Sequence, residues 1–144
     1  MRISGLWYLC DDGMLRPVIR GELQAADGAW VNAPFLVDTG ADRTVISAEI
    51  SNALHLRPID SPDRLSGVGG MADSVVVETA IRFTRDGDGK AIFRGQFAAF
   101  IDPETLDMSV LGRDILNMFA LIVDRQADTV CLLGQKHHYT IGIR

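Results

Sequence analysis

The chain has 144 residues, which suits one domain, so residues 1–144 are expected to form a single domain. Its 47% hydrophobic and 23% charged residues exclude an intrinsically disordered chain. A net charge of −5 argues against broad attraction to nucleic acid or to an anionic membrane, so neither is an expected partner.

Two cysteines, Cys10 and Cys131, are too few for a disulfide framework; free thiols are expected, and one bridge is the alternative. All apolar runs are shorter than the ~20 residues of a membrane-spanning helix. The apolar stretch after Arg2 is interrupted by Ser4 and Gly5 and has no small-residue cleavage site, so it does not predict a signal peptide. A cytoplasmic location is expected by default.

The first predicted element is a β-hairpin. Val18–Leu23 leads into a turn signal at Ala26-Asp27-Gly28. Apolar residues at Trp30-Val31 and Phe35-Leu36-Val37 then form a second arm, which runs into Asp38. A short helix follows this hairpin: Ser47 is a candidate N-cap for Ala48–Leu54, and Arg57-Pro58 is the expected stop.

A second hairpin is predicted later in the chain. Ser74–Phe83 is rich in β-branched residues, Asp86–Gly89 is a turn signal, and Ala91–Ile101 forms the return strand. The aspartates of this turn do not predict a calcium loop, because Lys90 occupies the position of the third oxygen ligand.

Two further elements complete the chain. Arg113–Phe119 has apolar residues near helical spacing, and Tyr139–Ile143 alternates like a terminal strand. Many strands with one or two short helices predict a closed or sandwiched all-β domain.

The most informative stretch is Phe35–Asp42, in which an apolar strand delivers Asp38, Thr39 and Gly40. Phosphoaspartyl enzymes of the dehalogenase type need a second Asp where Gly40 stands, and P-type pumps need Lys where Thr39 stands. The Gly-Lys-Ser/Thr pattern of a phosphate-binding loop is absent. The Asp-Thr-Gly motif therefore fits these other aspartate chemistries poorly, and a simple turn at Asp38 is the alternative to a catalytic role.

Three ordered segments then match one family. Leu36–Ile46 contains Asp-Thr-Gly-Ala-Asp, Ser66–Gly70 is a glycine-rich loop, and Val110–Leu116 has two apolar residues before Gly-Arg. The chain thus resembles the retropepsin family, the aspartic proteases of retroviruses and their cellular and bacterial relatives, over roughly residues 15–133. This resemblance implies a closed β-barrel-like acid-protease fold.

The resemblance also implies a homodimer. Aspartic proteolysis needs two carboxylates that share one proton around a water molecule. The chain contains Asp-Thr-Gly once, so a second copy must supply the other Asp38. The implied activity is that of an endopeptidase that cuts an extended polypeptide and needs no cofactor or metal. The alternative is a non-catalytic retropepsin-like module for peptide binding or dimerisation.

Site roles are implied residue by residue. Asp38 is the catalytic acid/base, Thr39 interlocks with its partner across the dimer axis, and Gly40 offers its carbonyl to the substrate. Arg113 pairs with Asp42 and ties the active loop to the late helix; a surface pair is the alternative. The implied flap and substrate-pocket residues are Gly67, Val68, Gly69, Gly70, Ala41, Asp42, Val45, Met108 and Val110.

Several of these residues have a plainer interpretation. Met108 and Val110 could belong to the core, and the flap glycines to an ordinary hairpin loop. His55, His137 and His138 have no Cys or carboxylate at ligand spacing, so no metal site is predicted.

Overall fold

The computed structural model of the protein describes residues 1–59, 63–67, 70–135, 140 and 142. Its helices are α1 (Ala48–Leu54) and α2 (Arg113–Leu116), with a short 3-10 turn, η1 (Asp86–Asp88). Its strands are β1 (Arg2–Ser4), β2 (Leu6–Leu9), β3 (Leu15–Gln24), β4 (Trp30–Val37), β5 (Val45–Ile46), β6 (Asp63–Gly67), β7 (Gly70–Thr84), β8 (Lys90–Phe100), β9 (Ser109–Leu111), β10 (Ala120–Asp124) and β11 (Thr129–Leu133).

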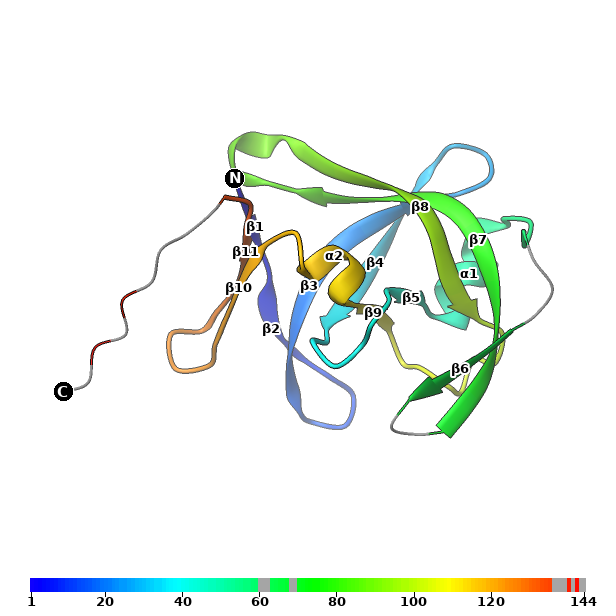
Figure 1. Ribbon diagram of the computed structural model, residues 1–144, viewed down its shortest axis with the longest axis horizontal. Helices are drawn as coiled ribbons and strands as arrows, with labels where there is room; N and C mark the ends of the chain where they lie inside the picture. The colour runs from blue at the N-terminus through cyan, green and yellow to red at the C-terminus, as the bar shows by residue number, and fades with distance from the viewer. Residues whose placement is uncertain (60–62, 68–69, 136–139, 141, 143–144) are drawn as a thin grey trace.

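The strands form two sheets. The larger has the order β2-β3-β4-β9-β5-β8-β7-β6, and β3 also pairs with β7, which closes a ring of strands (Figure 1). The smaller has the order β1-β11-β10 and lies beside the ring, on the left of Figure 1. The prediction of a closed all-β fold with short helices is therefore confirmed.

Both predicted hairpins are present. β3 pairs antiparallel with β4 across the turn that contains Gly28, and β7 pairs antiparallel with β8 across η1. Ser47 caps α1 by accepting a hydrogen bond from the amide of Ile50. The helix spans Ala48–Leu54 as predicted, but His55, in a left-handed conformation with φ 54°, ends it before Arg57-Pro58 is reached.

The late helix is shorter than predicted. α2 ends at Leu116, and the amides of Met118 and Phe119 donate to carbonyls only three residues back, so the chain tightens out of the α-helix. The apolar residues Leu116 and Phe119 still reach the core side. The predicted strand Tyr139–Ile143 falls outside the described residues, except for Thr140 and Gly142.

The core fills the ring between the two hairpins. Phe35 of β4 meets Phe83 of β7 edge to face at 5.7 Å, and Phe83 meets Phe93 of β8 at 6.1 Å. Phe93 in turn meets Phe119, so an aromatic row runs from the strand before Asp38 to the segment after α2. This row anchors the strand that leads to Asp38 and the segment that follows α2. In the part of the chain described here, no helix is long and apolar enough to span a membrane.

Candidate active site

Asp38 follows directly after β4, whose last three residues lie parallel to β9. Its amide donates to the carbonyl of Leu111 at 3.2 Å, so the aspartate is held at the end of a buried strand pair. Its Oδ1 accepts the amide of Gly40 at 2.9 Å, and its carbonyl accepts the amide of Ala41. Asp38 is half-buried, while Thr39 and Gly40 are exposed. The carboxylate is thus fixed in a tight loop with one oxygen left without a protein donor among the described residues.

The segment from Gly112 to Asp114 holds the other side of this loop. The amide of Arg113 donates to the carbonyl of Ala41 at 2.9 Å, and that of Asp114 to the carbonyl of Asp42 at 3.2 Å. Gly112 packs directly on the backbone of Arg43 and Thr44, and a Cβ there would lie 2.8 Å from the Thr44 nitrogen. Only glycine permits such a close approach of the two backbones, which explains why a glycine stands before Arg113.

A second connection was not predicted from the sequence. Thr44 is 1% exposed, and its hydroxyl donates to Asp114 Oδ1 at 2.7 Å while accepting the amide of Gly112 at 3.1 Å. The same Asp114 oxygen accepts the amides of Thr44 and Ile115, both at 2.9 Å. Thr44 lies within the first motif and Asp114 within the third, but nothing in their spacing identifies them as partners.

The predicted pair of Arg113 and Asp42 is present. Arg113 donates from Nη2 to Asp42 Oδ1, and from Nη1 to the carbonyl of Thr39 at 3.3 Å. However, the side chains are 46% and 81% exposed in the single chain. The pair therefore contributes little to folding of one chain, and the surface pair given as the alternative describes it in the single chain.

The glycine-rich segment belongs to a hairpin, as expected. β6 pairs antiparallel with β7 from Asp63 opposite Ser74 to Gly67 opposite Gly70, and the hairpin projects at the lower right of Figure 1. Val68 and Gly69, which follow β6 in the sequence, lie outside the described residues.

The predicted pocket residues are divided between core and surface. Val45 pairs with Val110 across β5 and β9, where Val110 is buried and Val45 half-buried. Ala41 is half-buried and Asp42 exposed beside Asp38. Met108 and Val110 also line a cavity of about 390 Å³ together with the β2–β3 hairpin. The contribution of that hairpin was not predicted, because the sequence before Met14 suggested no element.

No metal centre is formed within the described residues, where no group of three His, Cys, Asp or Glu side chains could hold an ion. Cys10 and Cys131 are free thiols, the second buried. His55 ends α1, and His137 and His138 fall outside the described residues.

Comparisons with known proteins agree with this geometry. Residues 25–115, more than half of the chain, match the family model "Aspartyl protease". A retropepsin-like aspartic protease from Rickettsia conorii is 18% identical with a TM-score of 0.57, over 92% of this chain and 98% of that one. EIAV protease complexed with the inhibitor HBY-793 is 24% identical with a TM-score of 0.51, over 71% of this chain and 86% of that one.

A search of curated proteins found no match. At these identities the solved structures establish the fold, which is that of the retropepsins, and the matched segment includes both the Asp38 loop and the Gly-Arg segment that holds it. The chain belongs to the aspartyl protease family.

Proposed function

We propose that the protein is an aspartic endopeptidase that works as a homodimer, with Asp38 as its catalytic residue. The observation that carries this proposal is the fixed Asp38 loop: a half-buried carboxylate at the end of a core strand, held by Leu111 and Gly40. Because the sequence contains Asp-Thr-Gly once, the second carboxylate must come from another copy.

The chemistry then follows from two Asp38 carboxylates that share one proton. The ionised carboxylate removes a proton from water, and the protonated one donates to the oxygen of the scissile carbonyl. The resulting hydroxide attacks the carbonyl carbon and forms a tetrahedral intermediate. The carboxyl group that took the proton from water donates it to the amide nitrogen, and the other carboxylate takes back a proton from a hydroxyl of the intermediate. The C–N bond then breaks, the amine and the carboxylic acid leave, and the pair again shares one proton.

The remaining residues have supporting roles in this proposal. Thr39 interlocks with its counterpart across the dimer axis, Gly40 presents its carbonyl to the substrate backbone, and the hairpin that ends at Gly67 and Gly70 closes over an extended peptide. Arg113 steadies the loop through the carbonyl of Thr39 and the carboxylate of Asp42.

The test is cleavage of a peptide library by the wild type and by Asp38→Asn, with Asp27→Asn as the matched control. Asp27 is exposed in the β3–β4 turn, at the opposite end of β4 from Asp38, so its variant should retain activity. Asp38→Asn should keep its fold and lose cleavage, because an amide cannot accept the proton from water. Wild-type rates for Asp38→Asn would exclude Asp38 as the catalyst. A folded wild type that binds but never cuts peptides would favour the non-catalytic module.

A further inference from the structure

A cavity of about 390 Å³ opens beside β4, the strand that leads to Asp38. Pro34 and Leu36, two residues apart on β4, line this cavity, and Asp38 follows Leu36 at the same spacing. Side chains two residues apart point to the same side of a strand, with their Cα atoms about 7 Å apart. Val110, which pairs with Leu36 across β4 and β9, lines the same cavity. If the scissile peptide bond lies at Asp38, a substrate side chain within about two residues of that bond can therefore enter the cavity.

The cavity has an apolar floor. Besides Pro34, Leu36 and Val110, it is lined by Leu106 and Met108, which are half-buried. Such a surface favours the methylene groups of a long side chain.

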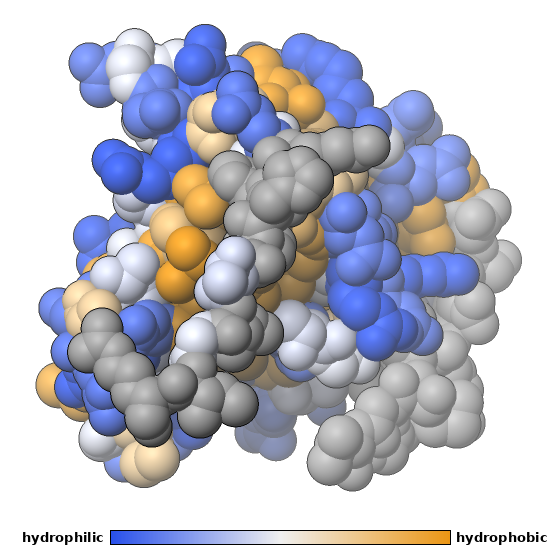
Figure 2. All heavy atoms as spheres, turned by 60° about the vertical axis from the view of Figure 1, so that its left-hand side comes forward, coloured by the Kyte–Doolittle hydropathy of each residue, from blue (hydrophilic) through white to orange (hydrophobic). Residues whose placement is uncertain are grey.

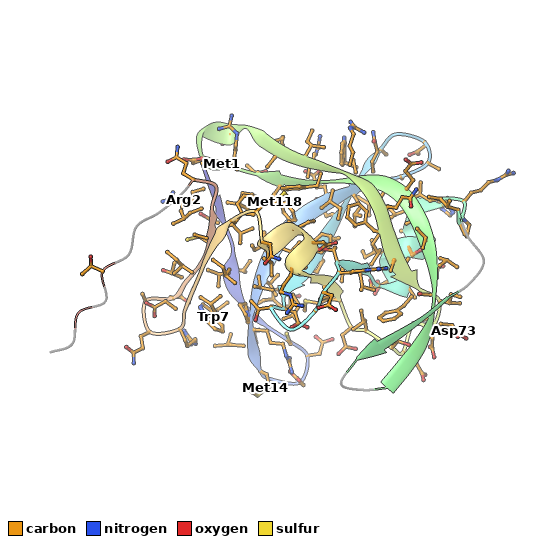
Figure 3. The ribbon with its side chains drawn as sticks, in the orientation of Figure 1. Met1, Arg2, Trp7, Met14, Asp73 and Met118 are labelled. Atoms are coloured by element: carbon orange, nitrogen blue, oxygen red, sulfur yellow. The ribbon has the colours of Figure 1, made fainter. Side chains whose placement is uncertain are left out.

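The rim of the cavity is acidic. Asp11 and Asp12 come from the turn between β2 and β3, and Glu104 and Asp107 from the loop between β8 and β9. Figure 3 shows the first of these turns beside the labelled Met14, which is 58% exposed. The two loops thus bring carboxylates from distant parts of the sequence to one opening.

The cation on this rim is already neutralised. Arg16 is the one basic residue among the described residues that line the cavity, and it binds Asp12 through two hydrogen bonds of 2.9 and 2.6 Å. These bonds hold the pKa of Asp12 at about 2, so the pair stays ionised in mildly acidic solution. Among the described residues no salt bridge reaches Asp11, Glu104 or Asp107, which leaves three carboxylates uncompensated at the opening.

We infer that this cavity is a specificity pocket for a long basic side chain, arginine or lysine, of the substrate. The methylene stem packs on the apolar floor and the charged end reaches Asp11, Glu104 and Asp107 at the rim. An acidic substrate side chain is repelled, and a neutral one leaves the rim charges unpaired. This inference rests on the proposed function for its place in catalysis, but it can be tested by binding alone.

The test uses peptide pairs that differ only in charge: arginine against citrulline, and lysine against norleucine, scanned through the positions around the cleavage site. For the wild type we expect one position where the basic residue raises kcat/KM by about threefold to fivefold, with the preference reduced by salt. The double variant Glu104→Gln/Asp107→Asn should lose most of this preference. Glu78→Gln, which removes an exposed carboxylate of β7 away from the cavity, should retain it.

A wild type that cuts peptides without basic preference at any position would overturn the inference and leave the proposed function intact. So would a preference that the double variant retains. If no peptide is cut, the proposed function fails, and the same peptide pairs are then measured for binding to Asp38→Asn by fluorescence anisotropy. Tighter binding of arginine than of citrulline, lost in the variant that also carries the rim substitutions, supports the inference; equal binding overturns it.

Discussion

Thr44 and Arg113 make a useful contrast at the residue scale. Both connect the Asp38 loop to the Gly112–Asp114 segment, but Thr44 is 1% exposed whereas the side chain of Arg113 is 46% exposed. Buried hydrogen bonds are costly to leave unmade, and exposed ion pairs are worth little. The buried hydroxyl, rather than the visible ion pair, is therefore the main stabilising contact between the two motifs in one chain.

We predict that Thr44→Val lowers the free energy of unfolding by about 1–3 kcal/mol, because Asp114 and the Gly112 amide lose the hydroxyl that satisfies them. Thr44→Ser keeps the hydroxyl and should recover most of the loss. Arg113→Ala should cost less than about 1 kcal/mol when measured on dissociated chains. Urea denaturation of the three variants checks this order. A larger loss for Arg113→Ala than for Thr44→Val would contradict it.

At the scale of elements, one ion-pair group joins three strands of the ring. Glu22 of β3 accepts hydrogen bonds from Arg82 of β7 at 3.0 and 3.1 Å, and Lys90 of β8 lies 3.6 Å away. The hydrogen bonds from Arg82 lower the pKa of Glu22 below its ordinary value of 4.5. Because the folded-state pKa is depressed, this contribution to stability is fully present above the unfolded pKa. It is lost as the pH falls through the folded value.

We predict that Glu22→Gln lowers the free energy of unfolding by about 1 kcal/mol at pH 7, and that the difference from wild type shrinks as the pH falls below about 4.5. Thermal unfolding at several pH values measures it. Asp128→Asn is the control, since the Asp128 side chain is 79% exposed and should show no such difference. A Glu22→Gln deficit that persists unchanged at pH 2 would mean that the pair is not its source.

The small sheet provides the second prediction at this scale. β10 forms its outer edge among the described residues, and its Ile122 and Val123 are 38% and 43% exposed. Figure 2, turned toward this side, shows apolar atoms gathered in the middle of the face. An apolar edge strand is a template for pairing with another chain, and the proposed site is incomplete without a second chain.

We predict that Ile122→Lys raises the dissociation constant of the proposed dimer by about tenfold or more. The new lysine charge must either be buried in the interface or separate the two paired edge strands. Sedimentation at several concentrations measures it. Ile92→Lys is the matched control: Ile92 is 47% exposed on β8, outside the small sheet. Equal effects of the two substitutions on the dissociation constant would show that β10 is not part of the dimer interface.

At the scale of the whole molecule, the proposed activity depends on assembly. We predict that adding an excess of Asp38→Asn chains to wild-type chains lowers activity more steeply than dilution of the active chain alone, once subunits exchange freely. Each hybrid holds a single carboxylate and cannot share a proton between two. Activity should also fall on dilution below the dimer dissociation constant. Full proteolysis by a species that sediments as a monomer would contradict both the dimer and the shared-proton mechanism.

The sequence by itself was sufficient for the local features. Turn signals between apolar and β-branched runs predicted the β3–β4 and β7–β8 hairpins, Ser47 predicted the cap of α1, and the order of three motifs predicted the family. These signals are local, because hairpin turns and helix caps depend on residues only a few positions apart. The end of α2 was less well predicted, since it depends on the conformation of the residues after Leu116. The range of α1 was predicted, but not the left-handed His55 that ends it.

Tertiary structure alone decided which distant residues meet. Thr44 and Asp114 are 70 positions apart, and the acidic rim combines loops near Asp11 and Glu104. β1 lies in the small sheet only because β11, near the other end of the described chain, pairs with it. Neither a hydroxyl nor a carboxylate carries a sequence signal for its partner, because pairing depends on the closure of the ring of strands. Exposure is decided in the same way: the sequence paired Arg113 with Asp42, but only the structure shows that both side chains are exposed in the single chain.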